Sequence, residues 1–75
     1  MKHTQQLTAI IEREGNGYVG LCPELDIASQ GDTIEAARNN LQEAVELFLE
    51  AADPSEIQSR RRAEVFVTQL EVEVG

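Results

Sequence analysis

DTIEAARNNLQEAVELFLEAA, residues 32–52, has the clearest periodic pattern in this 75-residue chain. Its apolar side chains recur every three or four positions, which collects them into one stripe along a helix of about 3.6 residues per turn. Asp32 and Thr33 can each cap the first turn, and Glu35 stands where it would form a capping box with Asp32. The pattern predicts an amphipathic helix over Thr33–Ala52. Its apolar stripe contains Ile34, Ala37, Leu41, Val45, Phe48 and Ala52.

Three short segments before the helix are predicted to be antiparallel strands. The first two, Gln5–Glu14 and Tyr18–Cys22, are rich in strand-forming residues, and Gly15-Asn16-Gly17 between them suits a tight hairpin turn. Pro23 ends the second segment, because proline cannot donate to a sheet ladder. A third segment, Leu25–Ser29, can then pair with the second as a meander before the chain turns into the helix.

The residues after the helix predict a loop and a last strand. Residues 54–62 are polar and show no clear period, whereas Glu64–Val74 places Phe66, Leu70, Val72 and Val74 on one face of a strand. A strand–helix–strand crossover is normally right-handed, which sets the last strand beside the first and parallel to it. We therefore expect an α+β fold, β-β-β-α-β, with a four-stranded mixed sheet of order 3-2-1-4 packed on one helix in a single domain of residues 1–75.

One helix covers only one face of such a sheet. Ile10, Val65 and Val67 would then lie on the other face, where no further element of the chain shields them. The domain is also small, and a domain of this size buries only about 60% of the surface that its unfolded chain exposes. We expect a homodimer, formed through strand edges or through sheet faces.

Charge and composition exclude several classes of function. Fourteen acidic residues against six basic ones give a net charge of −8, which repels nucleic-acid phosphates and anionic membranes and suits a basic partner, although acidity also serves solubility. His3 is the only histidine and Cys22 the only cysteine, so neither a metal site nor a disulfide has the parts it needs, and we expect no cofactor. No apolar run approaches the roughly 18 residues of a membrane span. We expect a cytoplasmic protein.

Two acidic groups are candidates for binding a partner. Glu43, Glu46 and Glu50 fall within one sector of the helix, towards an end where the helix dipole and mutual repulsion disfavour them, so that something other than helix stability favours their presence. A solvated helix face is the simpler explanation for any single one of them. The second group lies in the loop after the second strand. The candidate partner-binding residues are Pro23, Glu24, Asp26, Glu43, Glu46 and Glu50.

Two alternative functions rest on other residues. Glu12 and Glu14 share a strand face, and Glu24 and Asp26 repeat that spacing one strand later, so a divergent nuclease would need these four carboxylates to converge on a metal. The run Arg60-Arg61-Arg62 could fold back towards the helix end, or it could contact RNA in a stand-alone RNA-binding or regulatory module.

The chain resembles the HicB antitoxin family in two segments, GYVGLCPEL at residues 17–25 and SQGDTIEAA at residues 29–37. The resemblance implies a partly degenerate RNase H-like domain whose partner is a HicA-like toxin, a small basic mRNA interferase that the antitoxin neutralises by direct binding. Full-length members carry a C-terminal DNA-binding domain, for which this chain has no room, so DNA binding is not expected. The RNase H carboxylate cluster has no counterpart here, so enzymatic activity is not expected either.

Overall fold

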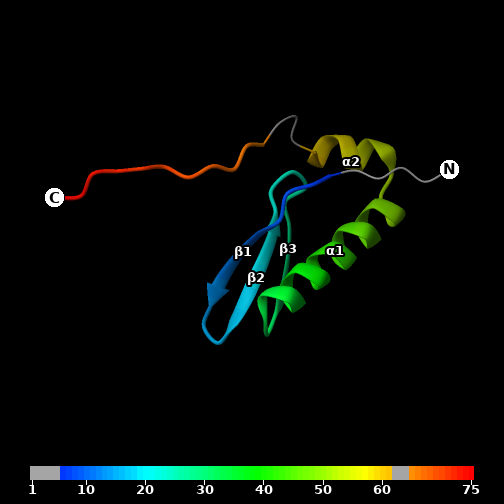
Figure 1. Cartoon of the computed structure of the whole chain (residues 1–75). Helices are drawn as coiled ribbons and strands as arrows, with labels where there is room; N and C mark the ends of the chain where they lie inside the picture. Colours follow the sequence, from blue (N-terminus) through cyan, green and yellow to red (C-terminus); the bar gives the residue numbers. More distant parts are fainter. Residues whose placement is uncertain (1–5, 62–64) are drawn as a thin grey trace.

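The computed structural model describes residues 6–61 and 65–75, and within them the chain is an α+β structure (Figure 1). Its three strands form one antiparallel sheet in the order β1-β2-β3, and one face of that sheet is covered by the longer helix, α1. A short second helix, α2, follows α1. The elements are β1 (Ile10–Glu14), β2 (Gly17–Cys22), β3 (Ile27–Gly31), α1 (Ile34–Ala51) and α2 (Pro54–Arg60).

The central helix lies where the sequence predicts it. The Oγ1 atom of Thr33 accepts a hydrogen bond of 3.0 Å from the N–H of Ala36, so Thr33 is the N-cap. The capping box predicted from Asp32 and Glu35 is therefore wrong, because the residue three positions after the cap is Ala36. At the other end, the N–H of Ala52 donates to the carbonyl oxygen of Phe48 at 2.9 Å before the chain turns.

β2 confirms the predicted Tyr18–Cys22 with one more residue at its start, whereas β1 is shorter than predicted and β3 is displaced. Gly15, at the start of the two-residue hairpin loop, has φ +60°, a value that glycine adopts freely. β1 begins only at Ile10, because the N–H of Thr8 donates to a side chain and not to a neighbouring strand. β3 begins two residues later than predicted, because residues 23–26 form a turn in which the N–H of Leu25 donates to the carbonyl oxygen of Cys22 at 3.3 Å.

The core lies between α1 and one face of β2 and β3. Ala37 and Leu41 of the predicted stripe are buried there together with Cys22 and Leu25. The surrounding half-buried residues are Leu7, Ile27, Val45, Phe48 and Leu49. Since Gly20 of β2 faces α1, its neighbour Leu21 and Leu21's partner Ile10 lie on the opposite, uncovered face, as the sequence predicts for Ile10.

The segment after α1 differs from the predicted loop. Pro54 begins α2, where its missing N–H costs nothing, and Asp53 precedes it at the N-cap position. The N–H of Ile57 donates to the carbonyl oxygen of Asp53 at 3.0 Å, and the Ile57 side chain is half-buried. The single apolar residue in this polar stretch gives no detectable period, which is why the sequence reads as a loop.

Residues 65–75 are extended but lie outside the sheet, so the four-stranded sheet of order 3-2-1-4 is not observed in the described residues. The segment runs away from the body of the molecule (Figure 1). Val65 and Val67 therefore do not join Ile10 on the uncovered face, and Glu64 lies outside the described residues. Alternation predicts that a segment can be a strand, but it does not say which edge the strand pairs with.

The end of β3 approaches α1 so closely that only glycine fits at residue 31. A Cβ atom at Gly31 would lie 2.5 Å from the backbone nitrogen of Ala37 and 2.7 Å from the carbonyl carbon of Ala36. We expect Gly31→Ala to lower the free energy of unfolding by about 1–3 kcal/mol, because helix and strand must separate. Gly75→Ala, which meets no atom within 4 Å, is the control in the same urea titrations. Equal stability of the two variants would contradict this packing.

Candidate functional site

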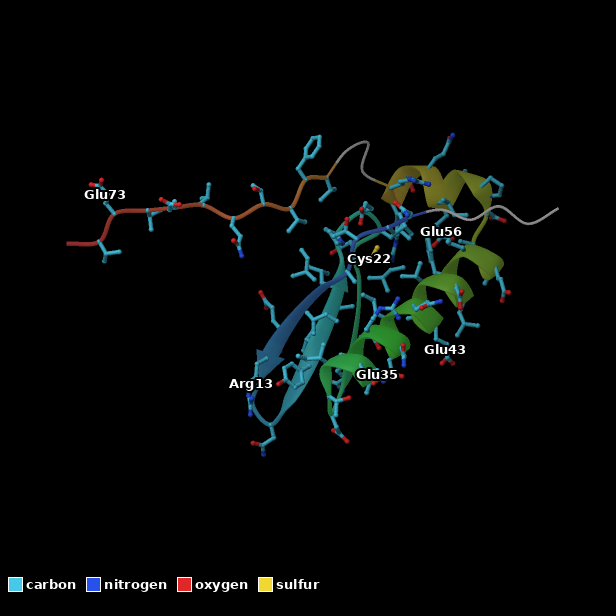
Figure 2. All side chains as sticks on the ribbon, in the orientation of Figure 1. Arg13, Cys22, Glu35, Glu43, Glu56 and Glu73 are labelled. Carbon is cyan, nitrogen blue, oxygen red and sulfur yellow. The ribbon has the colours of Figure 1, made fainter. Side chains whose placement is uncertain are left out.

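The acidic residues of α1 lie together on its exposed face. Glu43, Glu46 and Glu50 are all exposed, opposite the buried stripe that contains Ala37 and Leu41. The side chain of Glu43 points away from the sheet (Figure 2). Glu46 accepts a hydrogen bond of 3.5 Å from the Nε2 atom of Gln42, and the last turn of α1 contains no basic residue. The structure therefore brings these three candidate residues onto one surface, named here the acidic face.

The turn after β2 places its acidic residues differently. Asp26 is exposed, with φ +56°, whereas Pro23 and Glu24 are half-buried. The carboxylate of Glu24 accepts bonds from the N–H of Thr8 at 3.1 and 3.0 Å and from the Thr8 hydroxyl at 2.7 Å. Glu24 thus joins the segment before β1 to the turn between β2 and β3. The sequence does not predict this role, because the two-residue spacing of Glu24 and Asp26 does not show in which direction the Glu24 carboxylate points.

The same bonds shift the ionisation of Glu24. Partial burial raises the pKa of its carboxyl, but the hydrogen bonds from Thr8, from the backbone of Glu24 and from Cys22 together outweigh burial, and the pKa lies below its ordinary value. Beside it, burial raises the pKa of the Cys22 thiol, and the neighbouring Glu24 carboxylate raises it further. The Sγ atom of Cys22 lies 3.6 Å from Glu24. A protonated thiol buried to 1% exposure is a packing group and not a nucleophile.

The four carboxylates that a nuclease would need are not gathered into one site. Glu24 is bonded to Thr8, and Glu12 and Glu14 follow Thr8 by four and six positions, about 13 and 20 Å along an extended chain. Within residues 6–61 and 65–75, no group of three or more histidine, cysteine, aspartate or glutamate side chains could hold a metal ion.

The arginine run folds back in part. The guanidinium carbon of Arg60 lies 5.1 Å from the centroid of the Phe48 ring, a cation–π contact that draws α2 towards the end of α1. Arg61 also has a partner and lines the groove described next. Arg62 lies outside the described residues. The sequence left two alternatives for the arginine run, folding back towards the helix end or contacting RNA. Arg60 folds back towards the end of α1.

A groove of about 830 Å³, absent from the sequence prediction, lies between the segment before β1 and α1. It forms because α1 packs mainly on β2 and β3 and leaves the β1 side of the sheet open. The polar and charged residues that line it include Arg38, Gln42, Glu46 and Arg61. The apolar residues that line it are Leu7, Ala9, Cys22, Leu41, Val45, Leu49 and Ile57. One feature of the sequence points to this groove. Val45 and Leu49 lie four positions apart on the same side of α1, and they make the apolar surface of the helix wider than a three-stranded sheet covers.

The depressed pKa of Glu24 predicts a pH-dependent stability. A carboxyl whose folded-state pKa lies below its unfolded value of about 4.3 stabilises the fold above that pH, and the contribution is lost as the pH falls through the folded-state pKa. We expect Glu24→Gln to lower the free energy of unfolding by about 1–2 kcal/mol at pH 7 and by less at pH 3. Glu12→Gln, at an exposed position of β1, should change it little at either pH. The same loss for Glu24→Gln at both pH values would contradict the role of the carboxylate charge.

No helix among the described residues is long and apolar enough to cross a membrane. No protein-family model matches the chain, and no solved structure matches it significantly.

Curated relatives do match. A UPF0150 protein of Helicobacter pylori is 31% identical over 67 residues, which cover 88% of this chain and 93% of the relative. UPF0150 protein ssl0738 of Synechocystis sp. is 49% identical over 47 residues, 60% of this chain and 65% of that protein, so the match spans just under two thirds of this relative. UPF0150 protein ssr1765 of the same organism is 42% identical over 52 residues, 67% of this chain and 66% of that protein. The chain belongs to the UPF0150 family.

Proposed function

We propose that this protein is an antitoxin-like binding protein that neutralises a small basic mRNA interferase of the HicA type by direct binding. Membership of UPF0150, a HicB-like family, supports the proposal, as do the two segments at residues 17–25 and 29–37 that resemble HicB antitoxins. In this proposal the domain is a degenerate RNase H-like fold that retains binding without catalysis, and it acts in the cytoplasm, where the mRNA substrate of such a toxin is found.

The acidic face is the observation on which the proposal rests. Glu43, Glu46 and Glu50 are exposed together on a chain of net charge −8, and three like charges on one helix face cost stability without any gain in packing. Such a surface attracts a cationic partner and raises the rate of encounter, an effect that acts over about 10 Å at 0.1 M salt. A ribonuclease binds RNA through basic residues, so carboxylates that occupy those residues compete with the phosphates.

The turn contributes an exposed charge and a fixed shape. We propose that Pro23 and Asp26 contact the toxin, and that Glu24 acts mainly by holding the turn through Thr8. Because its carboxylate is already engaged, the charge of Glu24 is less available to a partner than that of Asp26, which is exposed. The turn is held by the bonds between Thr8 and Glu24 and by the bond from the Leu25 N–H to the Cys22 carbonyl oxygen. A turn that is already ordered loses little conformational entropy on binding, which lowers the cost of association.

A charge-matched comparison tests the acidic face. We expect the triple variant Glu43→Gln/Glu46→Gln/Glu50→Gln to associate with the basic toxin up to tens of fold more slowly at low salt, with most of the difference gone in 0.5 M salt. The control is Glu12→Gln/Glu14→Gln/Glu56→Gln, which removes the same charge from exposed positions elsewhere. Stopped-flow association rates measure both. If the two variants slow association equally, net charge alone acts and the acidic face is not the binding surface.

Co-expression tests the proposed class of function. A small basic protein encoded next to this one should arrest growth when expressed alone, and co-expression of this protein should restore growth through a complex that copurifies. A neighbour that is harmless alone, or that stays toxic and unbound in the presence of this protein, would reject the antitoxin proposal. Metal-dependent RNA cleavage lost on Glu12→Gln would instead favour the nuclease. Salt-sensitive RNA binding lost on neutralising Arg60–Arg62 would favour the RNA-binding module.

A further inference from the structure

The C-terminal residues form an extended segment of strand-like sequence that the sheet does not use. Phe66, Leu70 and Val74 are 80%, 85% and 92% exposed, and Val67 and Val72 are also largely exposed. Hydrophobic burial stabilises by about 25 cal/mol per Å² of apolar surface, so a chain with a core this small gains substantially if this segment is covered. Residues 65–74 are referred to below as the terminal segment.

The edge of β1 has no strand partner among the described residues. β1 pairs with β2 along one side, in the register Ile10 with Leu21 through Glu14 with Gly17, and β2 pairs with β3 on its far side. The outer edge of β1 therefore presents backbone N–H and C=O groups in the pattern that accepts another strand.

The groove is lined by residues 6–9, which lead into β1, and much of its lining is apolar, as an added strand that continues past the start of β1 requires. A strand next to β1 would place alternate side chains over the groove and over the uncovered sheet face. The terminal segment is apolar on both faces at its start, with Phe66 and Leu70 on one face and Val65 and Val67 on the other. Phe66 and Leu70 suit the groove, because its lining is largely apolar. Val65 and Val67 suit the uncovered sheet face, which carries Ile10 and Leu21.

We propose that the terminal segment of one copy adds as a strand to the β1 edge of a second copy and fills its groove, so that the protein is a strand-exchanged homodimer. Within its own chain the segment leaves the sheet and runs away from it, and the molecule is correspondingly long, 52 Å against 28 and 20 Å (Figure 1). In a two-fold symmetric dimer the same contact is made twice. The terminal segment of each copy then covers the β1 edge and the groove of the other copy.

The size of this contact is that of a stable interface. Each copy would contribute the terminal segment, the five residues of β1 and the residues that line the groove. Together these are roughly 20–30 residues on each side, the number found in interfaces of standard size. The exchange also leaves Glu43 and Glu50 exposed, since neither lines the groove. Two of the three residues of the acidic face thus stay open to a different partner, while Glu46, which lines the groove, lies beside the added strand.

Proline substitution tests the exchange in the full-length chain. Successive residues of a strand direct their N–H groups to opposite sides, so Gln69→Pro/Leu70→Pro removes at least one donor that points to β1 and costs little in a segment that is not paired. Light scattering should give about twice 8.3 kDa for the unmodified protein. The proline variant should be monomeric or should dissociate at a concentration at least tenfold higher, with unchanged helical circular dichroism and with loss of hydrogen-exchange protection at the β1 edge.

A second variant tests the groove, and a matched one controls for lost apolar surface. Phe66→Gln/Leu70→Gln should weaken the dimer at least tenfold, whereas Leu47→Gln, at a 57% exposed position of α1, should change the dissociation constant less than twofold. A monomer whose terminal segment is protected from exchange would show that the strand returns to its own chain and would overturn the proposal. A dimer that tolerates both double variants would overturn it too.

Discussion

The packing of α1 against β2 and β3 is the interaction on which the rest of this structure depends. Ala37 and Leu41 bring the helix onto the sheet, and Gly31 permits the close approach at the point where strand passes into helix. Because Ala37 is small and Gly31 has no Cβ, the backbone of β3 lies close to the backbone of α1 where the helix begins. The helix axis is thereby fixed over β2 and β3 and away from β1. The groove and the open β1 edge are direct consequences of that position.

The same helix serves two purposes on two faces. Its apolar stripe supplies Ala37 and Leu41, half of the buried core, and its acidic face supplies surface charge that the core does not need. A separate contact holds the start of β1, where the Glu24 carboxylate accepts hydrogen bonds from Thr8. These bonds replace the strand pairing that residues before Ile10 lack. In a chain of 75 residues each of these contacts matters, since a domain of this size has a margin of only a few kcal/mol.

Much of the fold follows from local sequence patterns. The helix is confirmed because its stripe continues over five turns, and the hairpin because Gly15 supplies the positive φ that its turn needs. β3 lies two residues beyond the predicted Leu25–Ser29, because a turn of four residues and an extended segment have similar sequences and only the bond from the Leu25 N–H distinguishes them. The α2 helix was missed because seven residues with one half-buried isoleucine give no period.

The candidate site was predicted only where exposure follows from periodicity. The side of α1 that carries Glu43, Glu46 and Glu50 must face water once the opposite side is buried, and it does. The direction of the Glu24 carboxylate depends on a contact with Thr8, sixteen residues away, which no local pattern encodes. The terminal segment shows the same limit, because its alternation predicts a strand but not the edge with which it pairs, and the segment lies outside the sheet.

In the proposed function, α1 builds the domain with one face and binds a basic partner with the other. Solution NMR of the labelled protein during titration with its proposed toxin distinguishes these two faces. We expect the amide resonances of Glu43, Glu46 and Glu50 to shift, together with that of Asp26, while the amides of Ala37 and Leu41 keep their protection from hydrogen exchange. Saturable shifts confined to the uncovered sheet face, with the α1 resonances unmoved, would contradict it.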